Sequence, residues 1–182
     1  MSDKRFHRTE KALKKAITEL LREKRLNEIS VVELCRRADM NKSTFYLHYK
    51  DIYDYYNYLN NTVSEKLCSL YGEYSYSEVL ENFSDIFLKS LTIIRDDELM
   101  GVLLMKDHGD TLITKITNDI THAVLSKKAP EDTDSLSTEI TCRFITFGTL
   151  GVIHEYSEQI FNNPELSETL AKQIQSGFMR IK

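Results

Sequence analysis

The sequence predicts an all-α protein, in which a small basic helix-turn-helix domain of three helices precedes a larger acidic helical domain. Only six glycines and two prolines occur in 182 residues, so long helices with few interruptions are expected. Apolar residues also recur at helical spacing along most of the chain. Residues 1–50 hold 13 basic and 7 acidic side chains, whereas residues 51–182 hold 11 basic and 21 acidic ones. This uneven charge indicates that a polyanion would bind at the N-terminal end.

Three helices are expected within residues 1–50. Residues 8–24 place their apolar side chains on one helical face, and lysine and glutamate fill the other face. Ser30 and Glu33 have the spacing of a capping box, which begins a short second helix. Residues 39–41 form the turn, and Asn41 is suited to cap a third helix from about Lys42 to Tyr49.

The remaining chain predicts a second domain, residues 51–182, that brings the total to about nine helices. A long helix runs from Asp51 to near Gly72, and a last helix begins at Asn163-Pro164, because proline is favoured in a first turn. The stretches between them with helical periodicity are 77–95, 98–107, 110–128 and 135–159.

The third predicted helix carries the candidate site. Phe45 and Tyr49 are four residues apart and would pack against the first two helices, which leaves polar side chains on the opposite face. A helix of this kind fits the major groove of duplex DNA, where such side chains can hydrogen bond base edges or phosphates. Tyr46 has the reach for a phosphate. The candidate DNA-binding residues are Lys42, Ser43, Thr44, Tyr46, Leu47, His48 and Lys50.

The stretch from Ile29 to Asp51 resembles the DNA-binding signature of TetR-family regulators, and the resemblance extends over about residues 8–60. The matching features are Ser30 as the cap of the second helix, Ala38 before the turn, Phe45-Tyr46 within the recognition helix and His48-Tyr49-Lys50 at its end. The resemblance implies a cytoplasmic bacterial regulator, expected to be a repressor, that binds palindromic double-stranded DNA as a homodimer. It also implies a helical body that binds a small-molecule effector or a partner protein.

Two positions depart from the family pattern. Asp39 stands where the family often has glycine, although aspartate tolerates unusual turn geometry. Ile52 stands where the family tends to have a lysine that meets a phosphate, and Lys50 with the start of the following helix would have to compensate. Ile52 supports an alternative function, a protein–protein coactivator or adaptor on the same fold with weak or lost DNA binding. The basic arm at residues 4–8 would lie on a phosphate strand, enter the minor groove, or extend as a free terminus.

The second domain contains two further features. The helix around residues 142–153 carries Gly148 and Gly151 beside bulky residues, so another helix can approach it closely. With the last helix it resembles the dimerisation region of a C-terminal type common among Firmicutes members of the family. Several tyrosines in 53–76 would either line an effector pocket or pack in the core or an interface; they are Tyr53, Tyr55, Tyr56, Tyr58, Tyr71, Tyr74 and Tyr76.

Other function classes find no support in the sequence. The N-terminus lacks the apolar core of a signal peptide, and the apolar run 140–153 is too short to span a bilayer. Cys35, Cys68 and Cys142 are isolated and odd in number, which disfavours disulfides and zinc sites and fits a reducing cytoplasm. No phosphate-binding loop, nucleophile motif or metal-binding histidine spacing occurs, since the three histidines of the body stand far apart. We therefore expect no cofactor and no enzymatic activity.

Overall fold

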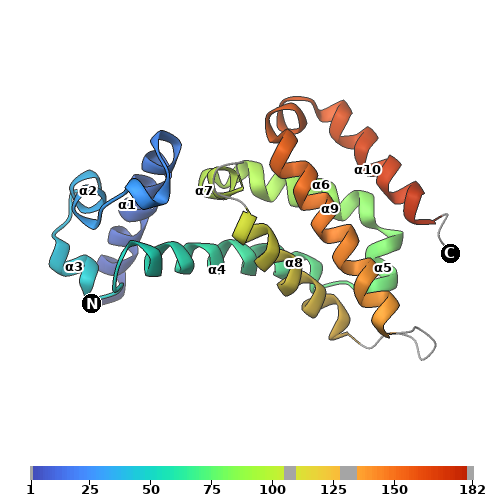
Figure 1. Cartoon of the computed structure of the whole chain (residues 1–182), viewed down its shortest axis with the longest axis horizontal. Helices are drawn as coiled ribbons and strands as arrows, with labels where there is room; N and C mark the ends of the chain where they lie inside the picture. Colours follow the sequence, from blue (N-terminus) through green and yellow to red (C-terminus); the bar gives the residue numbers. More distant parts are fainter. Residues whose placement is uncertain (1, 105–109, 128–134, 180–182) are drawn as a thin grey trace.

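A computed structural model describes residues 2–104, 110–127 and 135–179, with the side chains of 9–104, 110–127 and 136–177. The described residues form α-helices and one short 3₁₀ helix and contain no strand, so the predicted all-α class is confirmed (Figure 1). The elements are α1 (Ser2–Glu23), η1 (Leu26–Glu28), α2 (Val31–Arg37), α3 (Lys42–Tyr46), α4 (Ile52–Tyr71), α5 (Tyr76–Glu81), α6 (Phe83–Asp96), α7 (Glu98–Leu103), α8 (Asp110–Leu125), α9 (Ser135–Asn162) and α10 (Pro164–Met179).

Helices α1 to α3 form the head of the molecule, with α2 and α3 in the expected helix-turn-helix order. Ser30 caps α2 by accepting a hydrogen bond from the Glu33 backbone N–H at 3.2 Å, as the sequence predicts. In a full capping box the Glu33 carboxylate would also accept a hydrogen bond from the Ser30 N–H. Here that carboxylate instead binds Lys24 Nζ at 2.7 Å. Asp39 has a φ of 51°, so the turn does require the left-handed conformation for which the family often uses glycine.

Two boundaries in the head differ from expectation. Helix α3 ends at Tyr46 rather than Tyr49, because the chain tightens there: the His48 N–H donates to the Phe45 carbonyl at 3.0 Å, with the three-residue spacing of a 3₁₀ turn. Helix α1 begins at Ser2, so the backbone of the predicted basic arm is already helical. The side chains of residues 4–8 lie outside the described ones.

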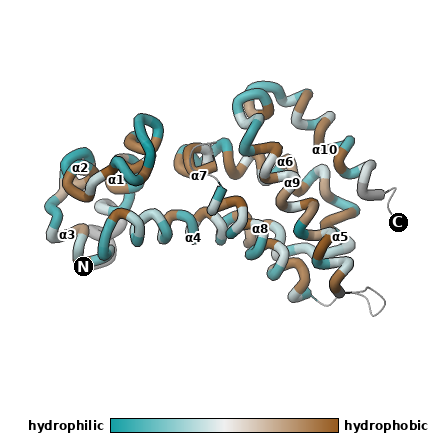
Figure 2. Tube along the Cα trace, in the orientation of Figure 1, coloured by the Kyte–Doolittle hydropathy of each residue, from teal (hydrophilic) through white to brown (hydrophobic). Residues whose placement is uncertain are grey.

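Helix α4 leads from the head into the body, where it packs against α8, and α8 packs against α9 (Figure 1). Helix α10 lies on α6. Polar and apolar positions alternate along these helices as one face of each turns inward (Figure 2). The helix expected over 77–95 is two helices, since Asn82 leaves helical geometry and its side chain donates to the Glu78 carbonyl at 2.9 Å. Because of this break the described residues form ten α-helices, where about nine were predicted.

The three cysteines are buried or half-buried, as small apolar residues usually are. Cys35 and Cys142 are buried, Cys68 is half-buried, and all three are free thiols. Burial raises the pKa of each thiol. Within the parts of the chain that are described, no helix combines the length and the apolar character needed to cross a bilayer.

Candidate nucleic-acid interface

The candidate DNA-binding face is carried by α3 and the turn that follows it. Four exposed candidates share one side of α3 and of the residue that follows it. Positions 42 and 46, and positions 43 and 47, are each four residues apart, about one helical turn; the residues are Lys42, Ser43, Tyr46 and Leu47. Tyr46 is 56% exposed and Leu47 79% exposed. The other candidates are dispersed: Thr44 is half-buried at the margin, and His48 and Lys50 are exposed beyond the end of the helix.

An aromatic cluster holds α3 from behind. Phe45 is fully buried, and its ring centroid lies 5.5 Å from that of Tyr49 and 6.0 Å from that of Tyr55. The Tyr49 and Tyr55 centroids are 4.7 Å apart. Burial raises the pKa of both tyrosine hydroxyls, so the cluster stays uncharged. Of the two roles open to Tyr55, core packing is therefore the one observed, and it joins α4 to the recognition helix.

Much of the positive charge of the head is neutralised within it. Lys24 pairs with Glu33 at 2.7 Å, and Arg37 pairs with Glu23 at 2.5 Å. Hydrogen bonds from these two cations lower the pKa of both glutamates. Arg36, Lys42 and Lys50 are exposed and form no ion pair with any described side chain. Their charge remains available to phosphates.

The start of α4 is occupied by the chain's own carboxylates. Asp51 accepts hydrogen bonds from the N–H groups of Tyr53 and Asp54, both at 2.8 Å, and Asp54 accepts one from the Lys50 N–H at 2.9 Å. Ile52, at the position of the family's lysine, is 7% exposed. The amides of Tyr53 and Asp54 already bind a carboxylate, which disfavours the expectation that the start of this helix compensates for the missing lysine; that expectation stays a prediction.

Asp97 connects the head to the body. It caps α7 by accepting from the N–H groups of Leu99 at 3.2 Å and Met100 at 3.4 Å. Its Oδ2 also binds Lys14 of α1 at 3.0 Å and Lys66 of α4. Burial alone would raise the pKa of Asp97, but the hydrogen bonds from the two lysines outweigh it and lower the pKa. No local pattern in the sequence signals this site, since its partners are 83 and 31 residues away.

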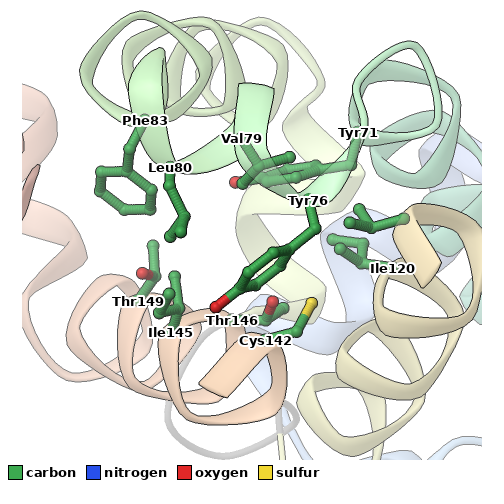
Figure 3. A pocket seen from close by; sticks show the side chains of 11 residues that line it. Tyr71, Tyr76, Val79, Leu80, Phe83, Ile120, Cys142, Ile145, Thr146 and Thr149 are labelled. Atoms are coloured by element: carbon green, nitrogen blue, oxygen red, sulfur yellow. The ribbon is translucent and has the colours of Figure 1, made fainter. Parts of the chain in front are cut away.

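The body encloses a small apolar cavity between α4, α5, α6, α8 and α9 (Figure 3). Its volume is about 10 Å³, room for about one water molecule. Tyr71 and Tyr76 line it, two of the seven tyrosines for which a pocket or a packing role was open, and no aspartate, glutamate, lysine or arginine is among the lining residues. That the cavity binds an effector stays a prediction. Thr146 and Thr149 of α9 contribute hydroxyls to the lining, and Thr146 lies beside the Cys142 thiol (Figure 3). Burial raises the pKa of the Tyr71 hydroxyl, which lies 3.3 Å from the Ser90 hydroxyl.

Helix α9 carries an exposed apolar stripe, which we define as Leu136, Ile140, Phe144, Phe147 and Gly151. Phe144 is 72% exposed, and the other three large side chains are exposed by more than half. A Cβ atom added at Gly148 or Gly151 would meet nothing within 4 Å. Nothing among the described residues therefore uses the space beside these glycines.

The histidines of the body stand apart. His122 is exposed on α8, and His154 on α9 has its Nδ1 2.7 Å from the Leu104 carbonyl oxygen. His108 lies outside the described residues. Across the described residues, no group of three or more histidine, cysteine, aspartate or glutamate side chains is arranged to hold a metal ion.

No protein-family model and no curated protein matches the chain. Among solved structures, the chain is similar to the TetR family repressor AlkX from Dietzia sp. strain DQ12-45-1b, described as implicated in biodegradation of n-alkanes. The two chains are 13% identical, the similarity covers 93% of this chain and 94% of that one, and the TM-score is 0.44. We therefore assign the functional residues from the geometry of this chain alone.

We predict that Asp97→Asn lowers the free energy of unfolding at pH 7 by about 1 kcal/mol, a value reduced for screening of two half-exposed lysines. Because an asparagine side chain can still cap α7, the decrease in stability measures the contribution of the two ion pairs. Because the folded-state pKa of Asp97 lies below its ordinary 3.8, its contribution is complete above that value. The contribution begins to decline below about pH 4 and is lost only as the pH falls through the lowered folded pKa, so the difference between the two proteins should shrink below about pH 4 and vanish at lower pH.

Urea unfolding of both proteins from pH 7 down to about pH 2 checks this prediction, because the range then extends below the lowered pKa of Asp97. Asp96→Asn is the matched control, because Asp96 is exposed and pairs only at the surface with Arg95. A difference that does not change with pH, or an equal loss in the control, would contradict the role given to Asp97.

Proposed function

We propose that the chain is a TetR-like transcriptional regulator, a repressor, that binds palindromic duplex DNA as a homodimer in the bacterial cytoplasm. The observation that carries this proposal is the exposed side of α3, which combines Lys42, Ser43, Tyr46 and Leu47 and contains no acidic residue. A buried aromatic cluster holds this side outward, so the helix can enter a major groove without rearrangement. The proposal includes no cofactor and no catalytic role.

A second candidate function rests on the start of α4. Two carboxylates, Asp51 and Asp54, lie where a phosphate contact is expected, and the lysine of the family is replaced by the buried Ile52. These features disfavour a polyanion at this point. They support a coactivator or adaptor that keeps the fold but binds DNA weakly or not at all.

The homodimer is proposed to form through the apolar stripe of α9. Exposed aromatic side chains of this size are costly in water and are typical of protein interfaces. A two-fold interface places the same stripe of both copies together, and Gly148 and Gly151 let the two backbones approach closely. The two heads would then lie on the same duplex. We propose that α9 and α10 together form a C-terminal domain of the Firmicutes type.

The proposed effector is a small uncharged molecule that enters the body cavity. The lining is apolar apart from hydroxyl and thiol groups, and a buried charge without a partner would be strongly unfavourable there. Because the cavity holds only about one water, an effector must displace a lining element. Helix α5 is the shortest of these elements and contributes Tyr76, Val79 and Leu80. A protein partner remains the alternative effector.

We predict that Lys42→Ala and Tyr46→Ala each weaken DNA binding about tenfold or more, through loss of a charge-assisted or hydroxyl contact. Both side chains are exposed, so stability should change little. For Lys42→Ala the slope of log affinity against log salt should become shallower by roughly 1.8 per dimer, since each lost phosphate contact contributes about 0.9.

The measurement is fluorescence anisotropy on duplexes selected from a random pool at low salt. Lys172→Ala, an exposed position on α10, is the control. Absence of saturable binding by the wild type would favour the adaptor, and normal binding by both variants would refute the recognition-helix assignment.

We expect Phe144→Glu to dissociate the dimer, raising its dissociation constant more than tenfold, because it places a charge in an apolar interface. The folded monomer should be almost as stable as the wild type, since the side chain is 72% exposed. Sedimentation velocity at several concentrations measures both species. The control is Val32→Glu on α2, an apolar residue of the head that is 55% exposed; equal dissociation by the control, or a monomeric wild type, would refute the interface.

For the effector, the test compares 2-naphthol with 2-naphthoate, which differ mainly in charge at pH 7. The uncharged compound should raise the melting temperature and the carboxylate should not, because a charge in the cavity would lose its hydration. Ile145→Trp, which fills the cavity from α9, should abolish the response. An equal response to the carboxylate, or an unchanged response in the filled variant, counts against this cavity.

A further inference from the structure

We propose that Leu47 recognises the methyl group of a thymine in each half-site of the bound DNA, an inference that rests on the proposed DNA-binding function. Leu47 has the highest exposure, 79%, among the large hydrophobic side chains described as exposed. It lies on the side of α3 that carries the polar candidates, not on the face that packs in the head.

The backbone holds this leucine in one position. Leu47 has helical backbone angles, φ −70° and ψ −22°, and its N–H donates to the Ser43 carbonyl at 3.2 Å. Buried aromatic residues anchor the chain on both sides, with Phe45 two residues before and Tyr49 two residues after. The exposure of Leu47 is therefore a built feature of the turn and does not result from a loose end.

The neighbours of Leu47 indicate what it contacts. Ser43 lies one turn before it and Tyr46 directly precedes it, and both are exposed and able to hydrogen bond. A leucine among such groups can offer only an apolar contact. The edges of base pairs in the major groove present one apolar group, the C5-methyl of thymine, beside the donors and acceptors that the polar side chains can bind.

A protein partner fits this surface less well. The stripe on α9 is continuous, whereas Leu47 stands among polar and charged side chains such as Lys42. Covering it with an apolar protein surface would desolvate that ammonium group without a partner. In the major groove the same lysine meets phosphates or base acceptors, so leucine and lysine are both satisfied.

The test uses duplexes selected from a random pool by the wild-type protein. Each thymine that recurs in the half-site is replaced singly by deoxyuridine, which removes only the methyl group. We expect one position to weaken wild-type binding about fourfold per half-site, the effect of exposing one buried methyl group. Leu47→Ala should bind the thymine duplex more weakly and bind thymine and deoxyuridine duplexes equally.

Ser43→Ala is the matched control on the same side of α3. It should weaken binding while keeping the full deoxyuridine penalty, because its contact does not involve the methyl group. Selected sites without a recurrent thymine, no deoxyuridine effect in the wild type, or an undiminished penalty in Leu47→Ala would each overturn the inference and leave DNA binding intact. Failure to select any sequence would overturn the proposed function as well, so the two failures are distinguishable.

Discussion

The carboxylate of Asp97 joins the head to the body. One of its oxygens caps α7, and the other binds one lysine from the head and one from the connecting helix α4. Arg22 of α1 adds a bond to Glu98 in the next position, at 2.5 Å. Helix α7 follows α6 directly, and Phe83 of α6 lines the body cavity. Under the proposed function, an effector that displaces α5 would act on α6, which follows it directly, and through α7 on the head, because these contacts are contiguous.

The head has a tightly packed aromatic interior, and some of the basic side chains on its surface are paired with glutamates. The ring cluster behind α3 leaves the recognition side little freedom to adapt, and the Tyr55 hydroxyl has no hydrogen-bond partner among the described residues. Such an unsatisfied hydroxyl costs free energy that a phenylalanine would not. Ion pairs such as Lys24–Glu33 also make the excess of basic residues a poor measure of the field that DNA would meet. The cations near α3 that form no ion pair with a described side chain, Arg36 and Lys42 among them, matter more than the total.

Local features of the head were predictable from the sequence because they depend on neighbouring residues. The Ser30 cap, the left-handed turn at Asp39 and the buried pair of Phe45 and Tyr49 all follow from short patterns. The end of α3 and the break at Asn82 were not predicted, since helical periodicity continues through both. The Asp97 site and the place of Tyr55 in the head depend on contacts between distant segments, which no pattern in one segment encodes. That the exposed side of α3 contacts DNA remains a prediction.

The start of α4 determines which of the two candidate functions the head can perform. Phosphate contacts contribute most of the binding that is independent of sequence, whereas base contacts contribute discrimination. Under the proposed function, Asp51 and Asp54 would disfavour one phosphate contact in each head and leave the exposed side of α3 unchanged. Non-specific affinity should then fall by the same factor as specific affinity, so the ratio between them is retained. A regulator with this head would need a good operator and a stable dimer to occupy it, which makes the stripe on α9 as important for DNA binding as the recognition helix.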